Sequence, residues 1–124
     1  MVTVQIDSTQ NVLVIRYTGR VGPDEAERCL EQVRLALPGI QPHFRVLTDL
    51  TALESMDVNC RPYLTSIMDV CNASGVAGVV RIIPDPKRDI GLQIMSLFHY
   101  GGDVKVITCE TADDAMKALE EIAT

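Results

Sequence analysis

The sequence predicts a single α/β domain over residues 1–124, with a mostly parallel central sheet, one antiparallel edge strand and about four helices. Three observations support this fold class. The 124 residues are 47% hydrophobic and 23% charged, which is typical of one soluble globular domain with a self-sufficient core. Along the chain, segments with the pattern of a strand alternate with segments in which apolar residues recur at helical spacing. The connections between them are short, which leaves no room for a second domain.

The N-terminal segment predicts two antiparallel strands. Val2, Val4 and Ile6 alternate with polar residues, and the polar run 7–11 separates them from an apolar segment at 12–17. A short polar connection between two such segments favours a hairpin. This pair supplies the antiparallel edge of the sheet.

A helix and a third strand follow. Pro23 suits the first turn of a helix, and apolar residues recur at helical spacing as far as residue 37. We therefore expect a helix over 23–37. The apolar segment 44–50 predicts the next strand.

The second half of the chain repeats the alternation. Gly75 is placed to end one helix, Asp89 is placed to begin another, and Thr111 with Asp114 resembles a capping box. The predicted elements are a helix at 59–73, a strand at 78–83, a short helix at 90–98, a strand at 104–107 and a final helix after Thr111. Strands and helices that alternate through short loops favour right-handed crossovers and parallel pairing.

The charge balance restricts the partners. Eleven Lys and Arg against seventeen Asp and Glu give a net charge of -6, so the chain has no basic field for phosphates, and neither nucleic acid nor an anionic membrane is expected. The aliphatic run 12–15 is far shorter than the roughly 20 residues of a membrane span. The first residues lack a signal-peptide pattern, so a cytoplasmic location is expected.

The residue types that carry catalysis do not form a recognisable motif. Cysteines at 29, 60, 71 and 109 show no CxxC or zinc-site spacing, which favours reduced thiols. His43 and His99 have no ligand at metal-binding spacing. The sequence therefore predicts no metal site, no cofactor and no enzymatic activity. One alternative is a reactive thiol at Cys60, where a helix N-terminus and Arg61 would lower its pKa.

Asp49 and Asp57 are the carboxylates that deserve weighing as a pair. Both are expected at the carboxyl edge of the sheet, where open α/β folds place ligands. The simpler interpretation is that both carboxylates stabilise local structure. In that interpretation Asp49 binds loop amides and Asp57 caps the second helix.

Three stretches of the chain carry a resemblance to a known family. They are Tyr17-Thr-Gly-Arg-Val21 with Pro23-Asp-Glu-Ala26, Val46-Leu-Thr-Asp-Leu50 with the loop up to Asp57, and the closing strand with Thr111-Ala-Asp-Asp-Ala-Met-Lys-Ala-Leu119. In this order and spacing, over about residues 3 to 122, they resemble the STAS domain family, the SpoIIAA-like anti-sigma factor antagonists of bacteria. The resemblance implies a non-enzymatic protein-binding domain.

The resemblance also implies where a partner would bind. The surface would be the loop from about Ser55 to Arg61 with the N-terminus of the second helix. The partner would be an anti-sigma or kinase-like regulatory protein or a transporter ATPase subunit. The residues implied are Asp24, Asp57, Val58, Asn59, Cys60 and Arg61, with Glu25 as a flanking contact.

Phosphorylation is the usual switch of that family, on a serine directly after the position of Asp57. This chain has Val58-Asn59-Cys60 there, and neither Val58 nor Asn59 has a hydroxyl group. Phosphorylation at the usual position is therefore not expected, which leaves Ser55 and Ser66 as alternatives.

Two further alternatives stay open at this stage. The predicted helix 90–98 is apolar on several sides and could cover a cleft for a small apolar ligand or lipid, as in SpoIIAA/SEC14-like relatives. The chain could also form a homodimer through an exposed sheet edge.

Overall fold

The computed structural model describes residues 1–83 and 104–122 of the chain. Within these residues the main sheet has five strands, in the order β1-β2-β4-β6-β7. The strands are β1 (Val2–Asp7), β2 (Val12–Tyr17), β4 (Arg45–Asp49), β6 (Gly78–Ile82) and β7 (Lys105–Cys109). The β1–β2 pair is antiparallel and the three other pairs are parallel, as the sequence predicts.

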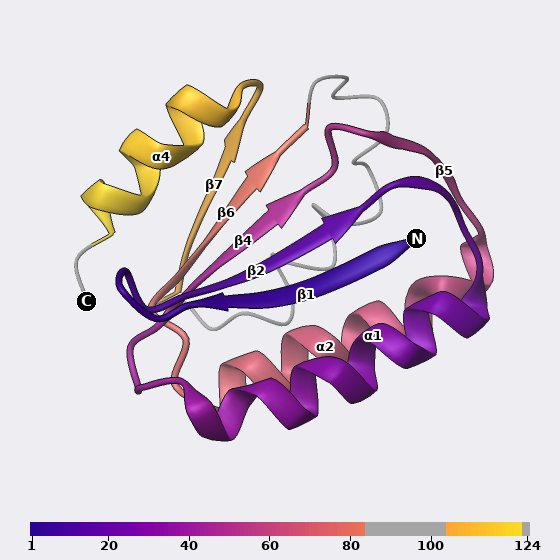
Figure 1. Ribbon diagram of the computed structural model, residues 1–124, viewed down its shortest axis with the longest axis horizontal. Helices are drawn as coiled ribbons and strands as arrows, with labels where there is room; N and C mark the ends of the chain where they lie inside the picture. The colour runs from indigo at the N-terminus through magenta and orange to yellow at the C-terminus, as the bar shows by residue number, and fades with distance from the viewer. Residues whose placement is uncertain (84–103, 123–124) are drawn as a thin grey trace.

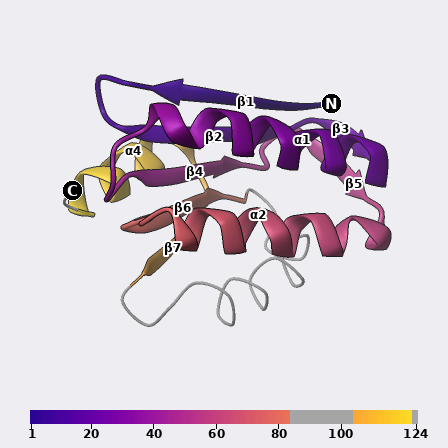
Figure 2. The ribbon, with the colours of Figure 1, turned by 90° about the horizontal axis from the view of Figure 1, so that it is seen from below.

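Helices cover both faces of this sheet. Helices α1 (Pro23–Ala36) and α2 (Arg61–Ala73) lie side by side on one face, and α4 (Ala112–Glu121) lies on the other (Figure 1). Figure 2 shows α1 and α2 from outside, running along the sheet. Two short 3-10 turns, η1 (Leu37–Gly39) and η2 (Val58–Cys60), follow α1 and precede α2.

The core lies on the two faces of the sheet because strand side chains alternate. In β2, Leu13 and Ile15 pack toward α1 and α2, whereas Val12 packs toward α4. All five residues of β6 are buried, as expected for a central parallel strand that is covered on both sides. Its charged member, Arg81, is only 4% exposed, and its Nη2 donates to Thr108 Oγ1 at 2.7 Å.

Most predicted elements are confirmed with small shifts of their ends. The expected helix 59–73 begins at Arg61, because residues 58–60 form the tighter turn η2. The expected strand 104–107 runs instead over 105–109. The Thr111 cap is confirmed, since Thr111 Oγ1 accepts a hydrogen bond from the Asp114 N–H at 3.2 Å. The predicted helix 90–98 lies outside the described residues.

A second, small sheet is absent from the sequence prediction. Strands β3 (Gly19–Val21) and β5 (Leu53–Met56) pair in parallel at one end of the main sheet. The first connects β2 to α1, and the second lies between β4 and η2. This pair positions the candidate site.

Candidate partner-binding surface

The β3–β5 pair brings together two loops that are far apart in the sequence. The Gly19 N–H donates to Ala52 O at 2.9 Å. The φ of Gly19 is +67°, a left-handed backbone conformation that favours glycine. At the other end of the pair, the Asp57 N–H donates to Val21 O at 3.0 Å. Between these bonds Arg20 lies opposite Ser55.

The turn at 57–60 is held by its own hydrogen bonds. Asp57 Oδ1 accepts from the Asn59 N–H at 2.8 Å, and Asp57 O accepts from the Cys60 N–H at 3.0 Å. Cys60 is fully buried, and its Sγ lies 3.7 Å from Val21 O. With Cys60 anchored inward, Val58 points out and is 64% exposed. An apolar side chain so exposed on a fixed turn is a candidate contact for a protein.

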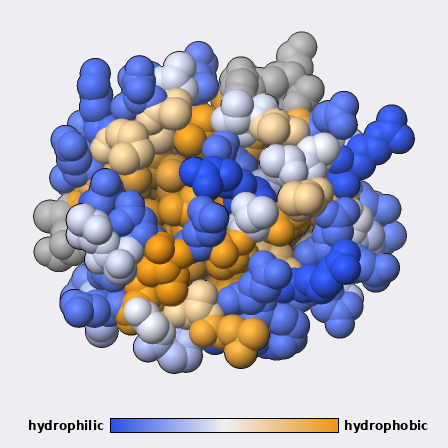
Figure 3. Space-filling view, viewed as in Figure 1, coloured by the Kyte–Doolittle hydropathy of each residue, from blue (hydrophilic) through white to orange (hydrophobic). Residues whose placement is uncertain are grey.

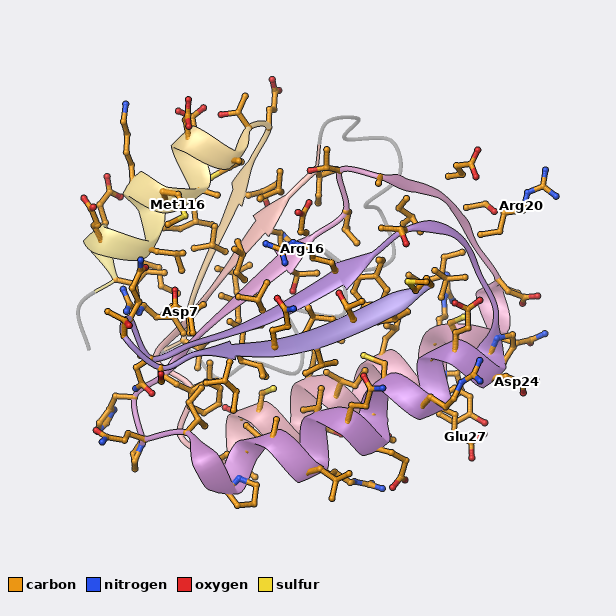
Figure 4. The ribbon with its side chains drawn as sticks, in the orientation of Figure 1. Asp7, Arg16, Arg20, Asp24, Glu27 and Met116 are labelled. Atoms are coloured by element: carbon orange, nitrogen blue, oxygen red, sulfur yellow. The ribbon has the colours of Figure 1, made fainter. Side chains whose placement is uncertain are left out.

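Beside this turn lies a hollow of about 320 Å³. Its lining residues come from β3, β5 and the start of the turn, and they are Arg20, Val21, Gly22, Ser55, Met56 and Asp57. Helix α1 begins at Pro23, next to the lining residue Gly22, and contacts η2. Figure 4 shows Arg20 and Asp24 at this same end of the molecule.

We call the exposed residues around this hollow the β5–η2 surface. They are Arg20, Asp24, Ser55, Asp57, Val58, Asn59 and Arg61. The surface combines two cationic side chains, two carboxylates and one apolar side chain, the mixture found in many protein interfaces.

Five of the six residues implied by the resemblance lie exposed on this surface, and Cys60 does not. Asp24, Asp57, Val58, Asn59 and Arg61 are all exposed. Since Cys60 is fully buried, its side chain positions the turn from inside. The flanking Glu25 is half-buried, and the Met1 amino group, 2.7 Å from Glu25 Oε2, lowers the pKa of this carboxyl.

The carboxylates have the structural roles that the sequence favours. Asp49 Oδ1 accepts from the Thr51 N–H at 2.9 Å, and its Oδ2 lies 3.4 Å from Arg16 Nε. Asp57 caps η2, the turn that leads into α2, rather than α2 itself. Each carboxylate therefore organises a loop.

The lowered pKa that the reactive-thiol alternative expects at Cys60 is contradicted. Burial raises the pKa of this thiol, and the nearby Asp57 carboxylate raises it further. A thiol with a raised pKa is a poorer nucleophile at neutral pH. Burial also raises the pKa of Cys29 to about 11 and that of Cys71 to about 12. All four cysteines are free thiols.

Sequence reasoning places Ser55 and Met56 in the partner-binding loop, but it missed Arg20 as a member of this site. The pairing of β3 with β5, which are three and four residues long, brings Arg20 to the turn. The available signal was Gly19-Arg20-Val21, which is part of the resemblance. It does not reveal which strand Arg20 lies against.

The remaining candidate features of the sequence either lie outside the described residues or form no membrane span or metal site among them. The helix 90–98, on which the small-ligand alternative depends, lies outside the described residues, and so does His99. Within residues 1–83 and 104–122, no helix is both long and apolar enough to cross a membrane. In the same ranges, no group of three or more His, Cys, Asp or Glu side chains could hold a metal ion.

Comparison with known proteins identifies the fold. No protein-family model matches the chain, and no curated protein does. A DUF3478-family protein from Shewanella loihica, described as having a SpoIIAA-like fold, matches with a TM-score of 0.73 and 17% identity over 95% of this chain and 93% of that chain.

Two solved structures of regulatory proteins are also similar. The Bacillus cell fate determinant SpoIIAA in its phosphorylated form has a TM-score of 0.67 and 16% identity, over 96% of this chain and 99% of that chain. An anti-sigma factor antagonist from Mycobacterium paratuberculosis has a TM-score of 0.63 and 18% identity, over 97% of this chain and 95% of that chain. At these identities the likeness establishes a SpoIIAA-like fold, as the resemblance implied.

Proposed function

We propose that this chain is a non-enzymatic protein-interaction module of bacterial regulation that binds a regulatory protein through its β5–η2 surface. The partner class is an anti-sigma or kinase-like protein, or a transporter ATPase subunit. The fold that the chain shares with anti-sigma factor antagonists supports this proposal. A shared fold alone leaves the function open, so the argument depends on the surface itself.

The observation that carries the proposal is the exposure of Val58. This side chain is 64% exposed, while the neighbouring Cys60 is fully buried and Asp57 is bonded to the Asn59 amide. The turn is therefore ordered before binding, which lowers the entropy lost on association. An apolar centre surrounded by polar residues is the usual arrangement of an interface.

Regulation of this surface does not proceed through phosphorylation at the usual position. Val58 and Asn59 stand where the resemblance places the acceptor serine, and neither can accept a phosphoryl group. Partner binding at this surface is therefore not switched by phosphorylation at that position.

The test is capture of the partner by matched asparagine variants. The tagged chain is used as bait in an extract of its source organism, and recovered proteins are identified by mass spectrometry. Asn59→Arg places a long cation in the β5–η2 surface. Asn72→Arg places the same side chain at the other end of α2, where Asn72 is also exposed.

We expect wild type and Asn72→Arg to recover the same kinase-like, anti-sigma or ATPase protein, and Asn59→Arg to lose it. Thermal denaturation of the three proteins checks that the fold is intact. Equal recovery by both variants would contradict the proposed surface. Recovery of a lipid or another small ligand alone would favour a binding pocket instead.

A further inference from the structure

Strand β1 forms one edge of the main sheet. Among the described residues, it pairs with β2 and with no other strand. Figure 2 shows β1 at the margin of the sheet, beyond α1. An edge strand presents unpaired backbone groups, which can pair with a strand of another molecule.

The hydrogen bonds to β2 determine which backbone groups of β1 face outward. Met1 and Thr18 exchange both bonds, with the Thr18 N–H donating to Met1 O at 2.8 Å and the Met1 amino group donating to Thr18 O at 2.7 Å. Bonded and non-bonded pairs alternate along an antiparallel ladder. The N–H and C=O groups of Val2, Val4 and Ile6 therefore point away from β2.

The side chains of this edge are divided by face. Val2, Val4 and Ile6 are half-buried and pack against the core under α1 and α2. Thr3 and Gln5 are exposed on the other face. Figure 3 shows apolar surface on the α1 side of β1.

Charge also permits two copies to meet here. Residues 2–6 contain no charged residue, although the whole chain carries a net charge of -6. They contain no proline or lysine either, the residues that commonly protect sheet edges. Strand β7, which is the opposite edge among the described strands, carries an exposed lysine, Lys105. Over residues 2–6, therefore, no like charges of two copies would face each other.

We infer that this chain forms a homodimer in which β1 of one copy pairs with β1 of a second copy, antiparallel and centred on Val4. A two-fold axis at Val4 places it opposite Val4 of the second copy, and Val2 opposite Ile6. All of these residues have outward-facing backbone groups, so three hydrogen-bonded pairs form. The same register keeps apolar side chains on one face, whereas a shift of one residue would oppose Val4 to a polar side chain.

A strand pair alone is small for a stable interface, so helix α1 has to contribute. A standard interface takes about 800 Å² from each partner, roughly a tenth of the 6862 Å² that this chain exposes. Helix α1 runs alongside β1, and Arg28 and Gln32 border a hollow of about 430 Å³ with Val2. Leu35, 80% exposed, follows them at helical spacing and adds apolar area.

Cysteine cross-linking tests both the dimer and its register. In Val4→Cys the two introduced thiols lie opposite each other, where the Cα atoms of a bonded pair are about 5.5 Å apart, within the range of a disulfide. In Thr3→Cys the thiol faces Gln5 of the second copy, and the two Thr3 positions are too far apart. The wild type controls for its own cysteines.

After mild oxidation we expect Val4→Cys to run at about 27 kDa, twice the 13.6 kDa of one chain, on a non-reducing gel. Thr3→Cys and wild type stay at the monomer mass. Analytical ultracentrifugation of the untreated wild type should also give a dimer. A wild type that is monomeric at all concentrations, or equal cross-linking of both variants, would overturn the inference.

Val4→Pro gives an independent test. Proline removes the outward N–H of residue 4 and none of the bonds to β2, so it is compatible with an edge strand. We expect Val4→Pro to be monomeric and Val4→Thr, which keeps the N–H, to remain dimeric. Circular dichroism checks that both variants fold. If Val4→Pro does not fold, the cross-linking pair decides.

Discussion

Helices α2 and α4 each follow a turn with a side-chain cap, and the two turns differ in what surrounds them. Asp57 accepts from the Asn59 N–H at 2.8 Å before α2, and Thr111 accepts from the Asp114 N–H at 3.2 Å before α4. The capping chemistry is the same, since a side-chain oxygen satisfies an otherwise unpaired N–H group.

The two turns differ in the contacts that anchor them and in the side chains that they expose. The Asp57 turn is bonded to β3 through Val21, has Cys60 buried behind it and presents the apolar Val58. The Thr111 turn presents the exposed Ala112, Asp113 and Asp114. A capped turn becomes a candidate binding surface when a second contact fixes it and an apolar side chain is left exposed.

The largest effect expected from this difference is on stability. Cys60→Asp places a carboxylate at a fully buried position, and we expect it to lower the free energy of unfolding by about 3 kcal/mol or more. Ala112→Asp introduces the same group at the exposed first position of α4 and should change it by less than about 0.5 kcal/mol. Urea denaturation measures both, and equal losses would contradict the anchoring role of Cys60.

The loss of stability at alkaline pH should depend on a thiol in the α1–α2 core, Cys29, more than on one in β7, Cys109. The pKa of Cys29 is about 11 in the folded chain against an ordinary 9.0, so the unfolded chain loses this proton first. The contribution of the Cys29 thiol to the free energy of unfolding is fully present below pH 9. It falls by about 2–3 kcal/mol as the pH rises through 11.

Removal of the Cys29 thiol should therefore reduce this fall. We compare Cys29→Ala with Cys109→Ala, whose thiol is half-buried in β7. The free energy of unfolding is measured between pH 8 and 11. A pH profile in which Cys29→Ala matches wild type would show that Cys29 does not carry the effect.

Removal of either cap should lower the free energy of unfolding by less than the Cys60→Asp change does. Asp57→Ala and Thr111→Ala should each cost about 1 kcal/mol, because each leaves one N–H without its side-chain acceptor. Their effects on partner binding should differ, since the loss of the Asp57 cap loosens the turn that carries Val58. If Thr111→Ala weakens binding as much as Asp57→Ala does, the contrast between the two turns is wrong.

The sequence could predict the elements whose patterns are long enough to recognise. Helix α1 is predictable from Pro23 and its regular apolar spacing. Strand β1 is predictable from alternation over six residues, and β2 from an apolar segment of the same length. Strands β3 and β5, of three and four residues, are too short for alternation to distinguish from a loop. They form because they pair with each other, which is a tertiary effect.

The candidate site was predictable only where its residues follow one another in the chain. Asp57, Val58, Asn59 and Arg61 were implied together, and all four are exposed on the β5–η2 surface. Arg20 is separated from them by 30 or more residues, and only the β3–β5 pairing brings it there. The buried Cys60 likewise contacts Val21, a residue distant in the sequence, so the order of residues did not reveal this contact.

The most direct measurement is the affinity of the captured regulatory protein for Val58→Asp and Ala112→Asp, determined by isothermal titration calorimetry. Both variants place a carboxylate at an exposed position next to a cap, one on each of the two turns. We predict that Val58→Asp raises the Kd at least about tenfold, as for a central apolar contact, and that Ala112→Asp leaves it unchanged. A Kd that is unchanged in both variants would contradict the assignment of the β5–η2 surface.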